Sequence, residues 1–153
     1  MICEQPREIS LHIFTSSENK AFVEDNVTIF QFVNLLNTTP ADTAGIMDSA
    51  YRQGWIEACD LAEPGKVLRR MDAARILHLY MQHVLGIPDL TDISAAGILK
   101  DLYDCRVCVN HIAQVYLRGI MDGVMIPSGN SSVIIFASQE PLRTSELMNI
   151  RLP

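Results

Sequence analysis

Apolar residues recur at helical spacing along much of the chain, and this pattern predicts a mainly α fold. The first helix is predicted from Thr28 to about residue 37, because Thr28 and Gln31 have the spacing of a capping box. A second helix is predicted from Pro40 to Gly54, since proline suits the first helical position and glycine suits a left-handed end. These two short helices would form an αα-hairpin. The inner face of the first helix is predicted to carry Phe32, Leu35 and Leu36.

The longest helical pattern begins at Arg70 and ends at Gly86, which again has the place of a C-terminal glycine. A short helix is predicted at residues 95–102, and another is predicted to begin with Asp104 as its cap and to end at Gly119. The apolar positions of the long helix are Ala73, Ile76, Leu77, Tyr80 and Val84. Those of the last helix are Val109, Ile112, Ala113 and Tyr116.

Two segments follow the period of a strand instead. Residues 8–14 alternate polar with apolar side chains, which predicts a half-buried strand. Residues 124–136 predict a β-hairpin with its turn around Gly129, and this hairpin could pair with residues 8–14. The predicted fold class is therefore mainly α, with a small β-hairpin or sheet from residues 8–14 and 124–136.

One short sequence motif occurs twice in the chain. Residues 50–56 and 115–121 both run through an aromatic residue to a glycine and then to two apolar residues, and the glycines, Gly54 and Gly119, are 65 positions apart. The segments that begin at Leu68 and Leu142 both open helices after these glycines, and a third version begins at Val27. Three helix openings thus alternate with two helix endings, an order that indicates a repeat architecture.

This order resembles the S-layer homology (SLH) domain of bacterial envelope proteins, in which a helix ends in Gly-Ile-x-x-Gly and the next opens on Leu/Ile-Thr-Arg-x-Glu. Residues 68–72 match the leucine, the arginine and, as aspartate, the acid. Residues 142–146 keep the leucine and the glutamate, and residues 27–31 keep the threonine and have glutamine for glutamate. Residues 119–123, Gly-Ile-Met-Asp-Gly, are closest to the helix-ending signature.

The resemblance implies a single SLH-like domain over residues 1–153, built from interlocked αα-hairpin units. A first partial module would cover residues 22–56, a middle module 57–121, and a last partial module with an inserted hairpin 122–153. In the family, the opening motif contributes to binding secondary cell-wall polysaccharide. The implied function is a non-catalytic binding or anchoring module of the cell envelope, although only one opening, at Arg70, keeps the family's arginine.

The candidate ligand-binding residues are Arg70 and Asp72 at a helix start and Trp55 after a helix-ending glycine. A guanidinium could pair bidentately with the carboxylate of a pyruvylated sugar polymer, and an indole could stack on a sugar face. The alternative is structural: Arg70 pairs with Asp72 or with a neighbouring module, and Trp55 belongs to the core.

Composition narrows the partners. The 153 residues are enough for one domain, and 48% apolar with 20% charged residues argues against disorder. A net charge of −6 gives no basic footprint for nucleic acid. We find no run near the roughly 20 apolar residues of a transmembrane segment, and no secretion signal is predicted at the amino terminus.

Cys105, Cys108 and His111 form the sharpest chemical signal, because spacings of three and six residues place them on one sector of a helix. Buried structural cysteines are the preferred interpretation; a metal site, a disulfide and redox chemistry are the alternatives. His78 and His83 are five apart and share no ligand face, so both are expected at the surface or partly packed.

No nucleophile elbow or phosphate-cradling glycine run is present, so no enzyme activity and no cofactor are predicted. Two other functions stay open beside glycan binding. One is an SLH-like scaffold for protein contact, with homo-oligomer formation through the hairpin edge. The other is a metal or redox protein built on the CxxCxxH helix.

Overall fold

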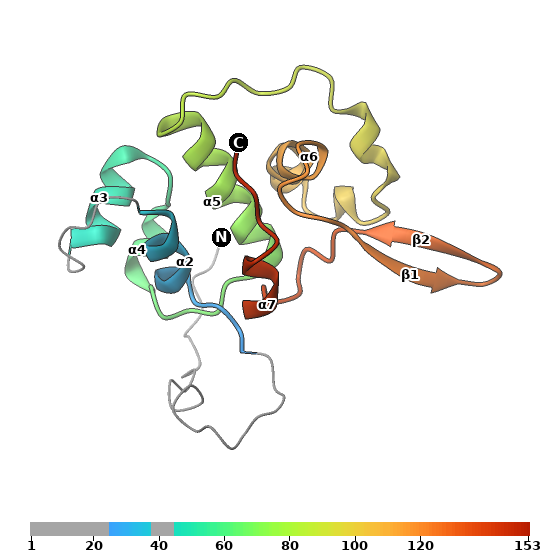
Figure 1. Cartoon of the computed structure of the whole chain (residues 1–153), viewed down its shortest axis with the longest axis horizontal. Coiled ribbons are helices and arrows are strands. Elements are labelled where there is room, and N and C mark those ends of the chain that lie inside the picture. Colours follow the sequence, from blue (N-terminus) through green and yellow to red (C-terminus); the bar gives the residue numbers. More distant parts are fainter. Residues whose placement is uncertain (1–24, 38–44) are drawn as a thin grey trace. The chain divides into compact units, whose positions relative to one another are not determined.

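The computed structural model of the chain describes residues 25–37 and 45–153, coloured in Figure 1. Helices dominate this part of the chain and a two-stranded antiparallel sheet accompanies them, so the mainly α class with a small hairpin is confirmed. The strand expected at residues 8–14 and the helix start at Pro40 lie outside the described residues. Within the described residues, no helix has the length and apolar character that crossing a bilayer requires.

The described chain divides into two compact units. Unit 1 holds the residues up to Leu68 together with the segment Pro141–Met148, and unit 2 holds Arg69–Glu140 together with Asn149–Pro153. Unit 1 contains α2 (Ile29–Leu36), α3 (Ile46–Gln53), α4 (Ala58–Ala62) and α7 (Thr144–Leu147). Unit 2 contains α5 (Arg70–His83), η2 (Ser94–Ile98), η3 (Leu102–Asp104), η4 (Arg106–Cys108), α6 (Val109–Leu117), β1 (Val124–Ser128) and β2 (Ser131–Ile135).

The predicted capping box opens α2. The Thr28 hydroxyl accepts the Gln31 N–H at 3.2 Å, and the Gln31 side-chain oxygen accepts the Thr28 N–H at 2.8 Å. The buried face differs from the predicted one, because Leu35 is 60% exposed. The helical period places the inner face on Ile29, Phe32, Val33 and Leu36.

Three segments of unit 1 that are distant in sequence meet through a ring of backbone hydrogen bonds. The N–H of Val27 donates to the carbonyl of Leu142 at 3.1 Å. The N–H of Leu142 donates to Leu68 at 2.8 Å, and the N–H of Leu68 donates to Val27 at 2.8 Å, which closes the ring. All three residues are buried, and each stands directly before the N-cap of α2, α5 or α7. The segment Pro141–Met148 is therefore part of the framework of unit 1.

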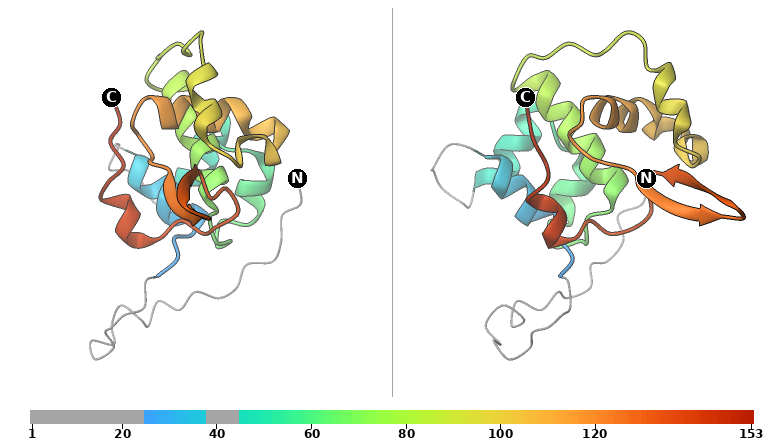
Figure 2. Two further views of the ribbon diagram at one scale, coloured as in Figure 1. Left: turned by 90° about the vertical axis from the view of Figure 1, so that its right-hand side faces the viewer. Right: turned by 45° about the vertical axis from the view of Figure 1, so that its right-hand side comes forward.

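In unit 2, α5 and α6 pack against each other, and the right-hand view of Figure 2 shows them next to one another. Two predicted elements differ here. The segment expected as a short helix at residues 95–102 forms the 3-10 helix η2, and Asp104 ends η3 instead of capping α6. The chain enters η4 through Cys105 as N-cap and continues directly into α6.

The helix-ending glycines behave as predicted. Gly54 and Gly119 have φ of 89° and 72°, in the left-handed region that favours glycine. The N–H of the next residue, Trp55 or Ile120, donates to the carbonyl five residues earlier, at 3.2 and 2.9 Å. In both copies this residue and the following one are buried. The motif that occurs twice in the sequence thus has the same local structure twice.

The predicted hairpin at residues 124–136 is confirmed as β1 and β2, with Ser128 opposite Ser131. One carboxylate fixes the chain beyond β2. The oxygens of Asp101 accept the N–H groups of Phe136 at 2.6 Å and Ala137 at 2.8 Å, where Ala137 has a φ of 61°. Because an ionised carboxylate binds backbone N–H groups strongly, Asp101 holds this turn in a conformation that is unusual for alanine.

Candidate functional site

Arg70 is the first residue of α5 and is only 6% exposed. Its Nε donates to the carbonyl of Phe136 at 2.8 Å, and its Nη2 donates to the carbonyl of Asp122. The guanidinium carbon also lies 4.8 Å from the centre of the Phe136 ring, within cation–π range. The guanidinium fork therefore binds the protein's own backbone and ring, and Arg70 ties the start of α5 to the ends of the hairpin segment.

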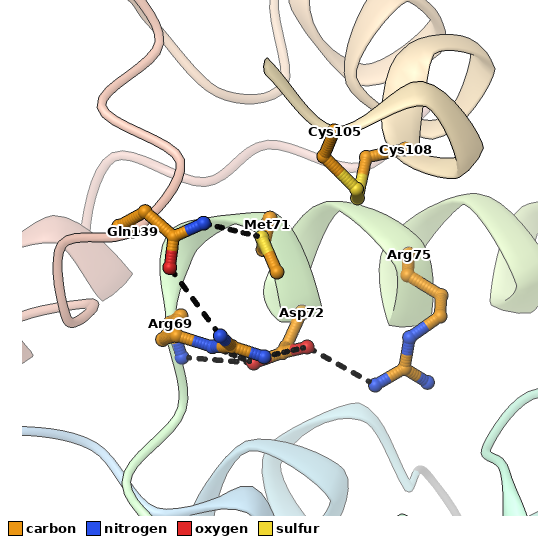
Figure 3. Close-up of a disulfide and its surroundings, with 7 residues drawn as sticks. All are labelled: Arg69, Met71, Asp72, Arg75, Cys105, Cys108 and Gln139. Carbon is orange, nitrogen blue, oxygen red and sulfur yellow. Dashed lines mark hydrogen bonds and ion pairs between the residues drawn. A yellow bond between two sulfur atoms is a disulfide. The ribbon is translucent and has the colours of Figure 1, made fainter. Parts of the chain in front are cut away.

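Asp72, two residues on, is buried and pairs with other arginines (Figure 3). It accepts from the Nε of Arg69 at 2.9 Å and from Arg75 at 3.5 Å, and it caps the helix by accepting the backbone N–H of Arg69 at 3.4 Å. The structural alternative predicted an ion pair between Arg70 and Asp72. In the structure, Asp72 instead pairs with Arg69 and Arg75. Arg70 and Asp72 share one turn but contact different parts of unit 2.

Trp55 lies in unit 1 and is 3% exposed. Its indole N–H donates to the side-chain oxygen of Gln53 at 3.0 Å. A buried indole offers no open face to a sugar ring, so Trp55 acts as a core residue that follows the left-handed glycine of α3.

Unit 1 carries a groove of about 220 Å³ along α2 and α7. Its lining is mostly apolar, with Asn34 on one side and Leu147 of α7 on the other, and Leu35 is part of it. None of the described residues that line the groove is ionisable. Sequence patterns did not reveal this groove, because its two helices are separated by more than a hundred positions in the chain.

Cys105 and Cys108 form a disulfide, drawn in Figure 3, with their Cα atoms 5.2 Å apart. The preferred interpretation, buried structural cysteines, is therefore wrong for this pair, and the disulfide that was one of the alternatives is present. Neither sulfur is open as a metal ligand. Within residues 25–37 and 45–153, no three His, Cys, Asp or Glu side chains are placed to hold a metal ion. His111 instead forms a hydrogen bond with another side chain.

That partner is His78 of α5, which is buried and not at the surface. The Nδ1 atoms of His78 and His111 lie 2.8 Å apart, and Nε2 of His78 lies 2.7 Å from a carboxylate oxygen of Asp89. Asp89 also accepts from the side-chain amides of Gln82 at 2.9 Å and Asn110 at 3.0 Å. The three ionisable groups thus form a hydrogen-bonded chain from Asp89 through His78 to His111.

The pKa values follow from this arrangement. Burial, followed by the charges of His78 and Arg75, lowers the pKa of His111 from its ordinary 6.5 to about 4. Burial alone would raise the pKa of Asp89, but the hydrogen bonds from His78 and Asn110 outweigh it and hold that pKa below its usual value. At neutral pH an ionised Asp89 then accepts from Nε2 of His78, and the hydrogen bond between the two Nδ1 atoms needs one proton, whose place depends on the tautomers of the two rings.

Sequence reasoning missed this cluster. His78 and His111 are 33 positions apart, and Asp89 lies in the loop after α5, so no local spacing connects them. Only the packing of α5 against α6 brings the two imidazoles together.

Comparison of the chain with protein-family models, with curated proteins and with solved structures finds no match. The functional argument therefore depends on the geometry and on the resemblance of the short sequence motifs to the SLH pattern.

Proposed function

We propose that this chain is a non-catalytic binding module of the SLH-like type that acts at the cell envelope. The observation that carries the proposal is the ring of backbone hydrogen bonds among Val27, Leu68 and Leu142. These residues hold the same position in the three helix openings aligned by sequence, and each donates to one of the others and accepts from the third. Three equivalent and interlocked modules are expected to make such a cyclic pattern.

A second set of hydrogen bonds also connects the three openings in a cycle, in the opposite direction to the first. In each opening, the first helical residue donates its N–H to the carbonyl that lies two positions before the ring residue of another opening. The pairs are Ile29 to Lys66 at 3.0 Å, Arg70 to Glu140 at 2.8 Å and Thr144 to Asp25 at 3.0 Å. Equal backbone roles at three aligned places support the repeat interpretation more strongly than the short motifs do.

The groove along α2 and α7 is the proposed binding surface, in place of Arg70 and Trp55, whose side chains are engaged within the fold. It belongs to two of the three openings, as a site in an interlocked module would. Its apolar lining suits the flat face of a sugar, and the Asn34 amide can both donate to and accept from sugar hydroxyls. Because the described lining residues include no ionisable side chain, the groove favours neutral sugars of the cell-wall polysaccharide over its anionic groups.

Sedimentation with purified Gram-positive cell-wall sacculi, before and after the secondary polymer is stripped, tests the proposal. Binding that is lost on stripping is expected. Leu35→Glu places a charge in the groove and is expected to weaken binding about tenfold or more, because it puts an ionised group where an apolar contact was. The matched control is Tyr51→Glu, an exposed apolar residue of α3 that does not line the groove. No co-sedimentation, or equal effects of both variants, would remove the glycan function.

A scaffold for protein contact is the second candidate. The uncharged groove favours it, and so does Met125, which β1 exposes on the hairpin. Sedimentation velocity over a range of protein concentrations tests self-association through the hairpin, and Met125→Lys is expected to reduce any dimer. If the chain is monomeric at all concentrations and does not bind sacculi, the search moves to other protein partners.

A further inference from the structure

We propose that the Cys105–Cys108 disulfide is a thiol–disulfide exchange site whose partner is a protein dithiol. This inference is independent of the binding function proposed above, because it concerns unit 2 and not the groove of unit 1. Four features of the pair support it: the small ring it closes, its place at a helix start, the unequal exposure of its sulfurs, and the apolar side chains beside it.

The disulfide adds little to what the backbone already fixes. It spans a single turn, in which the N–H of Cys108 donates to the carbonyl of Cys105 at 3.0 Å, and it encloses only Arg106 and Val107. In the chain-entropy account, the stabilisation from a crosslink grows with the length of the loop it closes. A bond that ties no distant segments together is therefore poorly explained as a structural staple.

Cys105 stands where a thiolate is favoured. It is the N-cap of η4 with extended backbone, φ −125° and ψ 102°, and η4 continues into the nine residues of α6. The unpaired N–H groups and the dipole at a helix start stabilise a negative charge at the cap. The exposed side chains on either side of Cys105, Asp104 and Arg106, carry opposite charges, so the preference for a thiolate comes from the helix start.

The two sulfurs differ in access. Cys108 is 8% exposed, whereas Cys105 is half-buried. Tyr103 and Val107, two positions to either side of Cys105, are 69% and 84% exposed. Apolar side chains exposed to this degree around a reactive sulfur suit contact with a protein better than contact with a small thiol. The expected encounter is thus a protein dithiol that approaches the Sγ atom of Cys105.

The reaction balances without any further reagent. A thiolate of the partner attacks Sγ of Cys105 and forms a mixed disulfide, while the bond to Cys108 breaks and Cys108 leaves as a thiolate that takes up a proton. The second thiol of the partner protein then loses its proton and attacks that protein's own sulfur in the mixed disulfide, and Cys105 is released as a thiolate. The partner ends as a disulfide and the Cys105–Cys108 pair ends reduced by two electrons.

Redox titration of the full oxidised chain in dithiothreitol buffers, followed by alkylation and peptide mass mapping, is the first test. Cys59, which is also disulfide-bonded, serves as the internal reference. Reduction of Cys105 and Cys108 while the near-UV circular dichroism stays native and Cys59 stays oxidised is the expected result. Reduction of the pair only together with unfolding would overturn the proposal.

Single-cysteine variants test the asymmetry. Cys108→Ser leaves Cys105, and the matched Cys105→Ser leaves Cys108. In the folded state at pH 7 we expect Cys105 to react with a small aromatic disulfide about ten times faster than Cys108, with a midpoint below about pH 8.5, the value of an ordinary cysteine. Equal rates for the two variants would contradict the assigned roles.

Val107→Glu tests the nature of the partner, with reduced thioredoxin as the protein dithiol and dithiothreitol as the small one. The variant is expected to slow reduction by thioredoxin about fivefold and to leave reduction by dithiothreitol nearly unchanged, because only a protein contacts the neighbouring side chains. Val84→Glu, an exposed residue at the end of α5, is the control. If dithiothreitol reduces the disulfide and thioredoxin does not, the proposal of a protein partner is wrong.

Discussion

The helices α2 and α5 occupy the same place in two copies of one opening motif, yet they use opposite chemistry. The cap of α2 is made by the neutral pair Thr28 and Gln31, and its first residue, Ile29, lies in the core. The cap of α5 is made with Asp72, and its first residue, Arg70, donates to two backbone carbonyls. The backbone hydrogen bonds at the start of the two helices are equivalent, whereas the side chains that cap and anchor them differ.

This difference extends along the two helices. α2 buries a single apolar face, whereas α5 is buried almost all round and includes Asp72, Arg75 and His78 among its buried residues. Buried charged groups cost free energy unless they are paired. The stability of unit 2 therefore depends on a set of polar partners that α2 does not need, and the following variants separate the two cases.

The largest loss is expected from Arg70→Ala. It leaves the carbonyls of Phe136 and Asp122 without their charged donor and removes the contact with the Phe136 ring, so the free energy of unfolding should fall by about 3 to 5 kcal/mol. Urea denaturation measures this. Ile29→Ala, the same position of α2, is expected to cost about 2 to 4 kcal/mol as a simple cavity. If Arg70→Lys were as stable as the native chain, the guanidinium fork would not matter.

Acid should destabilise unit 2 through His111. Its folded pKa of about 4 lies below the ordinary 6.5, so the unfolded chain binds the additional proton between these values and stability falls as the pH drops from 6.5 to 4. The loss should reach about 2 to 3 kcal/mol. Urea denaturation at several pH values measures it. His111→Asn should flatten the slope and His83→Gln, at the exposed end of α5, should not; a slope unchanged in His111→Asn would exclude this origin.

Removing the third residue of each cap compares the two capping boxes directly. Asp72→Ala also removes the carboxylate that accepts from Arg69 and Arg75 and should cost about 2 kcal/mol, whereas Gln31→Ala removes one neutral cap and should cost about 1 kcal/mol. Thermal denaturation of both variants checks the order. Equal losses would mean that the buried charges add nothing beyond the cap.

The smallest change is expected from Ser138→Ala. The Ser138 hydroxyl is buried and has no hydrogen-bond partner among the residues that the structure describes, so its removal should leave stability unchanged or raise it by up to about 1 kcal/mol. Asp101→Ala, which takes the carboxylate away from the same turn, should be clearly destabilising in the same denaturation series. A loss in Ser138→Ala would show that the hydroxyl has a role not visible in its contacts.

Local patterns predicted much of this structure. The capping box at Thr28, the left-handed Gly54 and Gly119, and the hairpin around Gly129 are encoded by neighbouring residues, because each depends on backbone preferences within a few positions. The position of Asp104 was misread, since the following turn is 3-10 and Cys105 takes the cap.

The candidate site was less predictable because it depends on pairings between distant segments. The sequence showed that Arg70 was unusual but not that its partners were the carbonyls of Asp122 and Phe136, more than fifty positions away. The same holds for the contact of His78 with His111. Spacing rules describe one helix at a time, whereas these contacts arise from packing two segments together.

The hydrogen-bond ring of unit 1 also sets an order of events during folding. Val27 and Leu68 can pair as soon as both have been synthesised, but the ring closes only when Leu142 follows, after the segment Arg69–Glu140 of unit 2 has been synthesised. Contacts of such large sequence separation form slowly, because the intervening chain must first be brought together. Until then, unit 1 exposes an incomplete edge, and we expect nascent chains that end before residue 141 to be sensitive to protease at α2.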